Sequence, residues 1–313
     1  GDCKALSNYF RCLLRAVGVQ SIYTVLNTHQ PHPYPGYCSI GQHDHVMVAV
    51  PLKETGDTLL VECTHRLPLG YRPGHVAGHD VLLVKSGGSR MVAVSDYADS
   101  LRRTDINATV RLREDGSAHI IVSDEYHLDL LEPWLEFRKW DADKQKNRLT
   151  SGIGFQPQDL AVTSVEDNFD SYDGKAGWCP VLKIGYEMDS RTFCRVTGTR
   201  LFIPVNLFTK RIYIQRSDRV NPLQNERGRC SHDVVTYRLP AGYKVESIPQ
   251  SIRLDDDWGT FTSEITVGDG TVTVDQFLHL KSFEADRSRY SDYRSFARAL
   301  NKAYDASIVL IAE

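Results

Sequence analysis

Cys3, His45 and Glu62 have the side-chain types that a cysteine-dependent acyl-transfer reaction requires. A thiolate is a strong nucleophile, and a histidine can accept the thiol proton near neutral pH. A carboxylate bound to one ring nitrogen of the histidine fixes the tautomer and leaves the other nitrogen for the thiol. The residue types alone leave a plain alternative open, in which Cys3 is a small residue at a helix end and the other two are polar strand residues.

The residues around Cys3 predict a helix whose first turn contains the thiol. Apolar side chains recur at helical spacing between residues 6 and 17, Asp2 is a candidate N-cap, and Gly18 ends the pattern. Unpaired N–H groups and the positive end of the helix dipole favour a thiolate at such a position, and Lys4 adds positive charge nearby. The helix would therefore supply part of the environment that a nucleophilic cysteine needs.

His45 and Glu62 fall on two consecutive predicted strands. Residues 45–51 are apolar and suited to a strand, and residues 53–57 are typical of a turn. Residues 58–64 then predict a second strand that runs back beside the first. The offset of 17 residues (62 − 45) suits a hairpin that brings the two side chains close. The sequence does not give the register of this pair, so it leaves open whether both side chains lie on one face.

Further strands are expected at residues 19–26, 80–85 and 90–94, the last two joined by a turn at Gly87 and Gly88. A helix followed by antiparallel strands is an α+β arrangement, which we assign to residues 1–95. The polar stretch from residue 95 to residue 104 is typical of a linker.

The rest of the chain consists mainly of short β-like runs separated by turn residues. We expect two β-rich domains with β-sandwich-like folds, at residues 103–205 and at residues 206–313, the second ending in a helix and a last strand. The expected strands are 109–112, 118–122, 160–165, 181–187, 211–215, 233–237, 243–248, 261–267, 271–280 and 308–311, and the expected helices are 128–149 and 291–304.

Composition excludes several classes of function. The net charge is −3 and the basic residues are dispersed, so nucleic acid is not an expected partner. No apolar stretch approaches the roughly 20 residues that span a bilayer, so no membrane span is expected. The sequence leaves the oligomeric state open.

Neither a cofactor nor a metal site is predicted. The seven cysteines include no C-x-x-C pair, and the histidines have no carboxylate or cysteine partner at a recognised ligand spacing. A disulfide between Cys179 and Cys194 is compatible with the sequence but not required by it.

Three separate segments follow one another in the order cysteine, histidine, acid. They are Gly1-Asp2-Cys3-Lys4 with the helix after it, Asp44-His45-Val46-Met47-Val48-Ala49-Val50-Pro51-Leu52, and Leu60-Val61-Glu62-Cys63-Thr64. These segments resemble the bacterial transglutaminase-like superfamily, and the match is specific over roughly residues 1–95. Residues 233–249 and the end of the chain from Tyr290 resemble, more weakly, the β-rich domains that follow this core in multidomain bacterial proteins.

The resemblance implies a papain-like fold, with residues 1–95 as the C-terminal part of a core that begins upstream in a longer parent chain. It implies that Cys3 attacks an amide carbonyl of a peptide or protein substrate, that His45 transfers the proton and that Glu62 orients His45. Gln42 and His43 lie beside the expected cleft and are candidate substrate-binding residues, although the alternative for His43 is a polar residue of a surface loop with no contact to substrate. The acyl group would pass to water or to an amine.

The resemblance also implies a periplasmic or secreted parent. A second hypothesis belongs to another class: a catalytically silent binding or assembly protein of the bacterial envelope, which uses its β-rich domains to engage a partner. A third is a stable fragment without an independent function.

Overall fold

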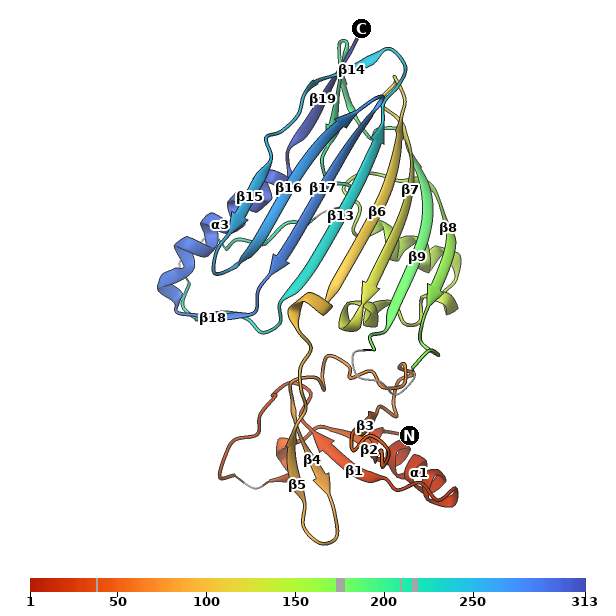
Figure 1. Ribbon diagram of the computed structural model, residues 1–313, viewed down its shortest axis with the longest axis vertical. Helices are drawn as coiled ribbons and strands as arrows, with labels where there is room; N and C mark the ends of the chain where they lie inside the picture. The colour runs from red at the N-terminus through yellow and green to blue at the C-terminus, as the bar shows by residue number, and fades with distance from the viewer. Residues whose placement is uncertain (38, 173–177, 209, 216–218) are drawn as a thin grey trace. The chain divides into compact units, whose positions relative to one another are not determined.

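The computed structural model describes residues 1–37, 39–172, 178–208, 210–215 and 219–313, in a mixed α+β fold that is rich in strands (Figure 1). The chain forms two compact units. Unit 1 contains residues 1–98 and 167–181, and unit 2 contains residues 99–166 and 182–313. No helix in the described ranges is both long enough and apolar enough to cross a membrane.

Unit 1 is built on a five-stranded antiparallel sheet with the order β3-β2-β1-β4-β5. Each predicted strand of residues 1–95 is present, and β2 has the predicted bounds. The strands are β1 (Ile22–Leu26), β2 (His45–Pro51), β3 (Thr58–Val61), β4 (Asp80–Val84) and β5 (Arg90–Ala93), and a 3₁₀ turn, η1 (Ile40–Gln42), precedes β2.

Helix α1 (Cys3–Ala16) confirms the predicted helix and its cap. The Asp2 side chain accepts a hydrogen bond from the Ala5 N–H at 3.0 Å, which satisfies one of the unpaired donors of the first turn. One turn after Cys3, the fully buried Ser7 donates its hydroxyl to the Val46 carbonyl at 3.2 Å. This contact packs α1 against β2 directly beside His45.

The opposite face of the sheet carries the core of unit 1. Leu26 and Met47 are fully buried there with Val76, which comes from the long segment between β3 and β4. His45 of β2 lies opposite Leu26 of β1, so the His45 side chain lies on the same face of the sheet as Leu26 and Met47. Val46 then points to the other face, by the alternation of a strand.

Unit 2 contains an eight-stranded sheet with the order β15-β16-β17-β13-β6-β7-β9-β8. β13 pairs in parallel with β6, so the strands from residues 103–205 and those from residues 206–313 form the two halves of one continuous sheet, joined at this pair. The boundary expected at residue 205 therefore falls inside one compact unit. The bounds are β6 (Arg103–Leu112), β7 (Ala118–His127), β8 (Gln158–Asp167), β9 (Val181–Ser190), β13 (Arg229–Arg238), β15 (Ile252–Asp255), β16 (Gly259–Gly268) and β17 (Thr271–Leu280).

Two smaller sheets and the C-terminal helix complete unit 2. Helix α3 (Tyr290–Tyr304) confirms the predicted terminal helix and buries Leu300 and Tyr304 against Phe261 of β16. The smaller sheets consist of β10 (Arg195–Thr197), β11 (Arg200–Pro204), β19 (Ser307–Ala312) and β14 (Tyr243–Ser247), and of β12 (Leu223–Asn225) with β18 (Phe283–Ala285). Short 3₁₀ turns lie at η2 (Asp99–Leu101) and η5 (Arg287–Arg289).

The single helix expected at residues 128–149 is wrong. The segment forms two 3₁₀ pieces, η3 (Leu128–Trp134) and η4 (Phe137–Lys139), and then α2 (Ala142–Thr150). Pro133 has no N–H to continue a helix, and Asp141 starts a new one by accepting from the Lys144 N–H at 2.8 Å.

The strand expected at residues 211–215 is also wrong, because the structure gives these residues no strand partner. The Ile212 N–H donates to the Asn301 side chain at 2.9 Å, and the Asn301 amide donates back to the Ile212 carbonyl at 3.0 Å. A helix side chain thus satisfies the backbone groups that a neighbouring strand would otherwise pair.

Candidate functional site

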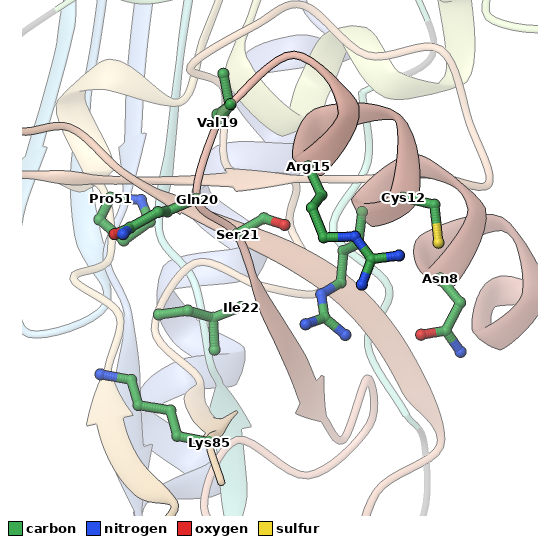
Figure 2. Close-up of a pocket in the computed structure, with 11 residues that line it drawn as sticks. Asn8, Cys12, Arg15, Val19, Gln20, Ser21, Ile22, Pro51 and Lys85 are labelled. Carbon is green, nitrogen blue, oxygen red and sulfur yellow. The ribbon is translucent and has the colours of Figure 1, made fainter. Parts of the chain in front are cut away.

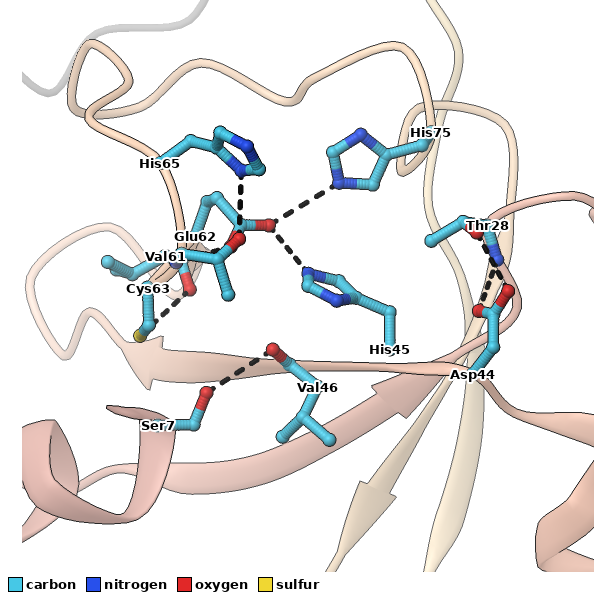
Figure 3. A network of polar contacts seen from close by, with 11 residues as sticks. Ser7, Thr28, Asp44, His45, Val46, Val61, Glu62, Cys63, His65 and His75 are labelled. Atoms are coloured by element: carbon cyan, nitrogen blue, oxygen red, sulfur yellow. Dashed lines mark hydrogen bonds and ion pairs between the residues drawn. The ribbon is translucent and has the colours of Figure 1, made fainter. Parts of the chain in front are cut away.

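The structure brings His45 and Glu62 together across the hairpin of β2 and β3. Val48 pairs with Val61, and continuing this register by one residue sets Glu62 opposite Met47, on the same face as His45. Glu62 Oε2 lies 2.7 Å from His45 Nε2 (Figure 3). The Glu62 side chain is only 2% exposed and that of His45 is 14% exposed, so the contact is shielded from bulk water.

Thr64 holds the other oxygen of the Glu62 carboxylate. Its N–H and its hydroxyl both donate to Glu62 Oε1, at 2.7 and 2.6 Å. Burial alone raises the pKa of Glu62, but the hydrogen bonds from His45, His75 and Thr64 outweigh it and hold that pKa well below its ordinary value. Glu62 is therefore an ionised, fixed acceptor at neutral pH, with Oε2 directed at the imidazole.

His75 is a third member of this cluster, and its position there was not predicted from the sequence. Its Nε2 lies 3.4 Å from Glu62 Oε2, and its ring meets the His45 ring edge-on, with centroids 5.5 Å apart (Figure 3). His75 belongs to the segment between β3 and β4, a loop that contains neither helix nor strand. The adjacent apolar Val76 and Ala77, both fully buried, are the signal in the sequence that this loop folds back onto the sheet.

Cys3 is the first residue of α1, and its side chain is half-buried. The hydrogen bonds and ion pairs of the described residues include none that joins Cys3 to His45. Residues three or four apart lie on one helix face, so Cys3 is one turn from Ser7, which touches β2 at Val46. The His45 ring extends to the other side of β2 from the Val46 side chain (Figure 3). The bond to Glu62 occupies His45 Nε2, which leaves Nδ1 as the nitrogen available for proton transfer.

Gln42 and His43 line a pocket of about 510 Å³ together with Tyr34, Ile40 and other largely apolar side chains. The Gln42 amide is engaged with its own loop: its oxygen accepts from the Tyr34 N–H at 2.7 Å, and its nitrogen donates to the Tyr37 carbonyl. Burial lowers the pKa of His43, so this ring is neutral at pH 7. Both predicted substrate-binding residues therefore line this pocket, and the Gln42 amide also supports its own loop.

A separate pocket of about 720 Å³ lies beside the second half of α1. Figure 2 shows Cys12 and Arg15 of α1 and Lys85, which follows β4, around this pocket. Neither Cys3, His45 nor Glu62 lines it. We therefore place the candidate chemistry at the His45–Glu62 contact and not in the pocket beside α1.

The described cysteines, a set that does not include Cys38, are free thiols. Cys179 and Cys194 are among them, so the disulfide that the sequence left open is not formed. Burial raises the pKa of both thiols, and that of Cys194 reaches about 12. Cys194 is therefore an unreactive core residue.

Comparisons with known proteins give a partial match. A family model described as a domain of unknown function with a solved structure (DUF3858) matches residues 199–310. Among solved structures, one titled "putative protease" from Parabacteroides distasonis ATCC 8503 is similar, with 13% sequence identity and a TM-score of 0.49. The similarity covers 97% of this chain and 43% of that one, so the chain spans less than half the length of this neighbour. The search of curated proteins found no match.

Proposed function

We propose that this protein is a cysteine-dependent hydrolase or acyltransferase of the transglutaminase-like type that acts on peptide-type amides. Cys3 is the nucleophile, His45 the general base and acid, and Glu62 the group that orients His45. The observation that carries the proposal is the buried 2.7 Å contact between His45 Nε2 and Glu62 Oε2, which gives the base a fixed ring and a defined tautomer. The resemblance of the three segments to the superfamily supports the assignment of Cys3.

The chemistry follows from the nitrogen that Glu62 leaves available. His45 carries its proton on Nε2, where the carboxylate accepts it, and uses the Nδ1 lone pair to take the Cys3 proton as sulfur attacks the carbonyl carbon. The tetrahedral intermediate collapses, the C–N bond breaks, and Nδ1–H protonates the leaving amine. Water or a second amine then attacks the thioester, His45 removes the proton of that nucleophile, and the C–S bond breaks to restore the thiol.

The local fold of unit 1 is compatible with a papain-like catalytic core, which we propose for residues 1–95. α1 carries Cys3 in its first turn, where unpaired N–H groups favour negative charge, and Ser7 docks this helix on β2 beside His45. Closure of the site requires the Cys3 sulfur to reach His45 Nδ1. The resemblance supports a peptide or protein substrate and a periplasmic or secreted parent, with unit 2 as an accessory β-rich part.

The test is an acyl-transfer assay on the full-length protein. It is incubated with a protein digest and a fluorescent primary amine, and mass spectrometry counts labelled side chains and newly formed peptide ends. We expect one of these products, and we expect Cys3→Ser to abolish it while Cys12→Ser, which removes an exposed thiol on the same helix, leaves it unchanged. Equal product yield from the Cys3→Ser variant would rule out the proposed nucleophile.

A silent binding or assembly protein remains the second candidate. The observation that favours it is that no hydrogen bond among the described residues joins Cys3 to His45. In that case, the assay gives neither product with any variant, and the His45–Glu62 contact serves only to stabilise the hairpin of β2 and β3.

A further inference from the structure

We propose that His45, Glu62 and His75 form a binding site for a divalent transition-metal ion, best suited to zinc, and that the bound ion suppresses the thiol chemistry of the same site. The second half of this statement rests on the proposed function, whereas the first half stands on geometry alone. Two imidazoles and one carboxylate are a ligand set that zinc commonly uses when a further position stays open for water.

The ligand atoms already converge. His45 Nε2, Glu62 Oε2 and His75 Nε2 all lie within 4.8 Å of one another, and the two contacts to the carboxylate oxygen are 2.7 and 3.4 Å. Bonds of about 2.1 Å in tetrahedral geometry separate ligand atoms by about 3.4 Å. The His75 contact has this spacing, and the His45 contact reaches it when the His45 ring moves outward by less than about 1 Å.

The groups around the ligands support metal binding. Thr64 occupies Glu62 Oε1 with two hydrogen bonds, which fixes the carboxylate and leaves Oε2 for an ion. The Glu62 side chain is 2% exposed and that of His75 is 30% exposed, so an ion would enter from the His75 side and keep a water ligand there. Among the described residues, no lysine or arginine forms an ion pair with Glu62, so its negative charge is not neutralised by a cation of that kind.

A second cluster of similar composition shows what a less suitable site looks like. Asp105, Glu125 and His127 of unit 2 also lie within 4.8 Å of one another. Arg103 already pairs with Asp105 at 2.7 Å, and Lys183 pairs with Glu125 at 2.7 Å. These cations neutralise both carboxylates and would repel a divalent ion, so we assign the metal to the His45 cluster alone.

Metal binding and proton transfer compete for one imidazole. A metal ion takes the lone pair of His45 Nε2, so the ring proton must move to Nδ1. The proposed base needs the opposite tautomer, with the proton on Nε2 and the lone pair on Nδ1. A neutral imidazole has only one such lone pair, so the zinc-bound protein has no base for the Cys3 thiol.

The direct test is zinc binding by metal-free, full-length protein, measured by calorimetry or by competition with a chromophoric chelator. We expect one ion per chain and a loss of affinity of at least about 100-fold in His75→Ala, because two ligands remain where three were present. His65→Ala is the matched control, since His65 contacts Thr64 at 2.8 Å without being a proposed ligand. We expect that variant, and Cys3→Ser, to bind zinc as the parent does.

Absence of stoichiometric binding, or equal affinity of His75→Ala and the parent, would overturn the site. A loss of affinity in Cys3→Ser would show that the ligand set is wrong. Cobalt absorption supplies a second readout that does not depend on activity, and circular dichroism checks that His75→Ala is folded.

The effect on chemistry is measured separately, as the rate at which iodoacetamide alkylates Cys3. We expect zinc to slow this reaction in the parent and to leave His75→Ala at its own zinc-free rate. An equal effect of zinc on both proteins would refute the competition. If zinc binds as expected but Cys3→Ser is as active on amides as the parent, the proposed function fails and the metal site stands.

Discussion

Asp124 of β7 is buried in unit 2, and replacing it by asparagine tests how the fold accommodates a charge in its interior. The residue is 3% exposed. Its Oδ2 accepts hydrogen bonds from Tyr126 at 3.1 Å and Tyr186 at 3.0 Å, whereas its buried Oδ1 has no partner among the described residues. Burial raises the pKa of this carboxyl from 3.8 to about 7, because the two tyrosines offset only part of the cost of burying the charge.

The sign of the effect on stability follows from proton binding. The folded state holds the Asp124 proton up to about pH 7, whereas the unfolded chain releases it near pH 3.8. The free energy of unfolding therefore falls as the pH rises from about 4 to about 7, and this loss is complete above pH 7. A difference of about 3 pH units corresponds to about 4 kcal/mol.

Asp124→Asn removes this dependence, because the asparagine amide is neutral at every pH and its oxygen can still accept from both tyrosines. We expect the variant to match the parent near pH 4 and to exceed it by up to about 4 kcal/mol above pH 8. Urea unfolding followed by tryptophan fluorescence measures this. Three of the four tryptophans, Trp134, Trp140 and Trp258, lie in unit 2, so a Trp178→Phe background makes the signal specific to that unit.

Asp269→Asn, in the exposed turn between β16 and β17, is the matched control for an aspartate at the surface. A stability difference between Asp124→Asn and the parent that is the same at pH 5 and pH 9 would refute the assignment of a raised pKa to Asp124.

Three further predictions concern unit 1. Glu62→Gln should make unit 1 less sensitive to acid, because the lowered pKa of Glu62 contributes stability that is present above its unfolded value of 4.5 and lost as pH falls; acid titration by circular dichroism checks this. Ser7→Ala should cost about 1 kcal/mol in urea unfolding by removing the bond to Val46. Gln42→Ala should speed amide hydrogen exchange at Tyr34, whose N–H loses its acceptor; unchanged exchange would contradict the loop-supporting role.

Local patterns were sufficient for the elements that build the candidate site. The Asp2 cap, the helical spacing that follows it and Gly18 define α1, and the apolar run of residues 45–51 gives β2 with its observed bounds. Hairpin spacing predicted that His45 and Glu62 lie close together, but it did not show whether both side chains lie on one face. The pairing of Val48 with Val61 in the structure shows that they do.

Long-range pairing is the part that the sequence did not reveal. β6 and β13 are neighbours in the sheet although more than 100 residues separate them, and no periodicity within either strand encodes this parallel pairing. His75 was missed for the same reason. It reaches Glu62 only because the loop that contains it folds over the sheet and buries Val76. The apolar Val76 and Ala77 indicate that the loop is buried, but no local pattern gives the place on the sheet where it packs.

The most direct test of the proposed catalytic role is the rate of Cys3 alkylation by iodoacetamide as a function of pH, measured on full-length, metal-free protein in a Cys12→Ser background. If His45 takes the Cys3 proton, the rate stays high well below pH 8.5, where an ordinary thiol is protonated, and this plateau disappears in His45→Ala and shrinks in Glu62→Gln. A rate that rises only near pH 8.5 and is the same in the parent and in His45→Ala would contradict the proposal that these side chains act together.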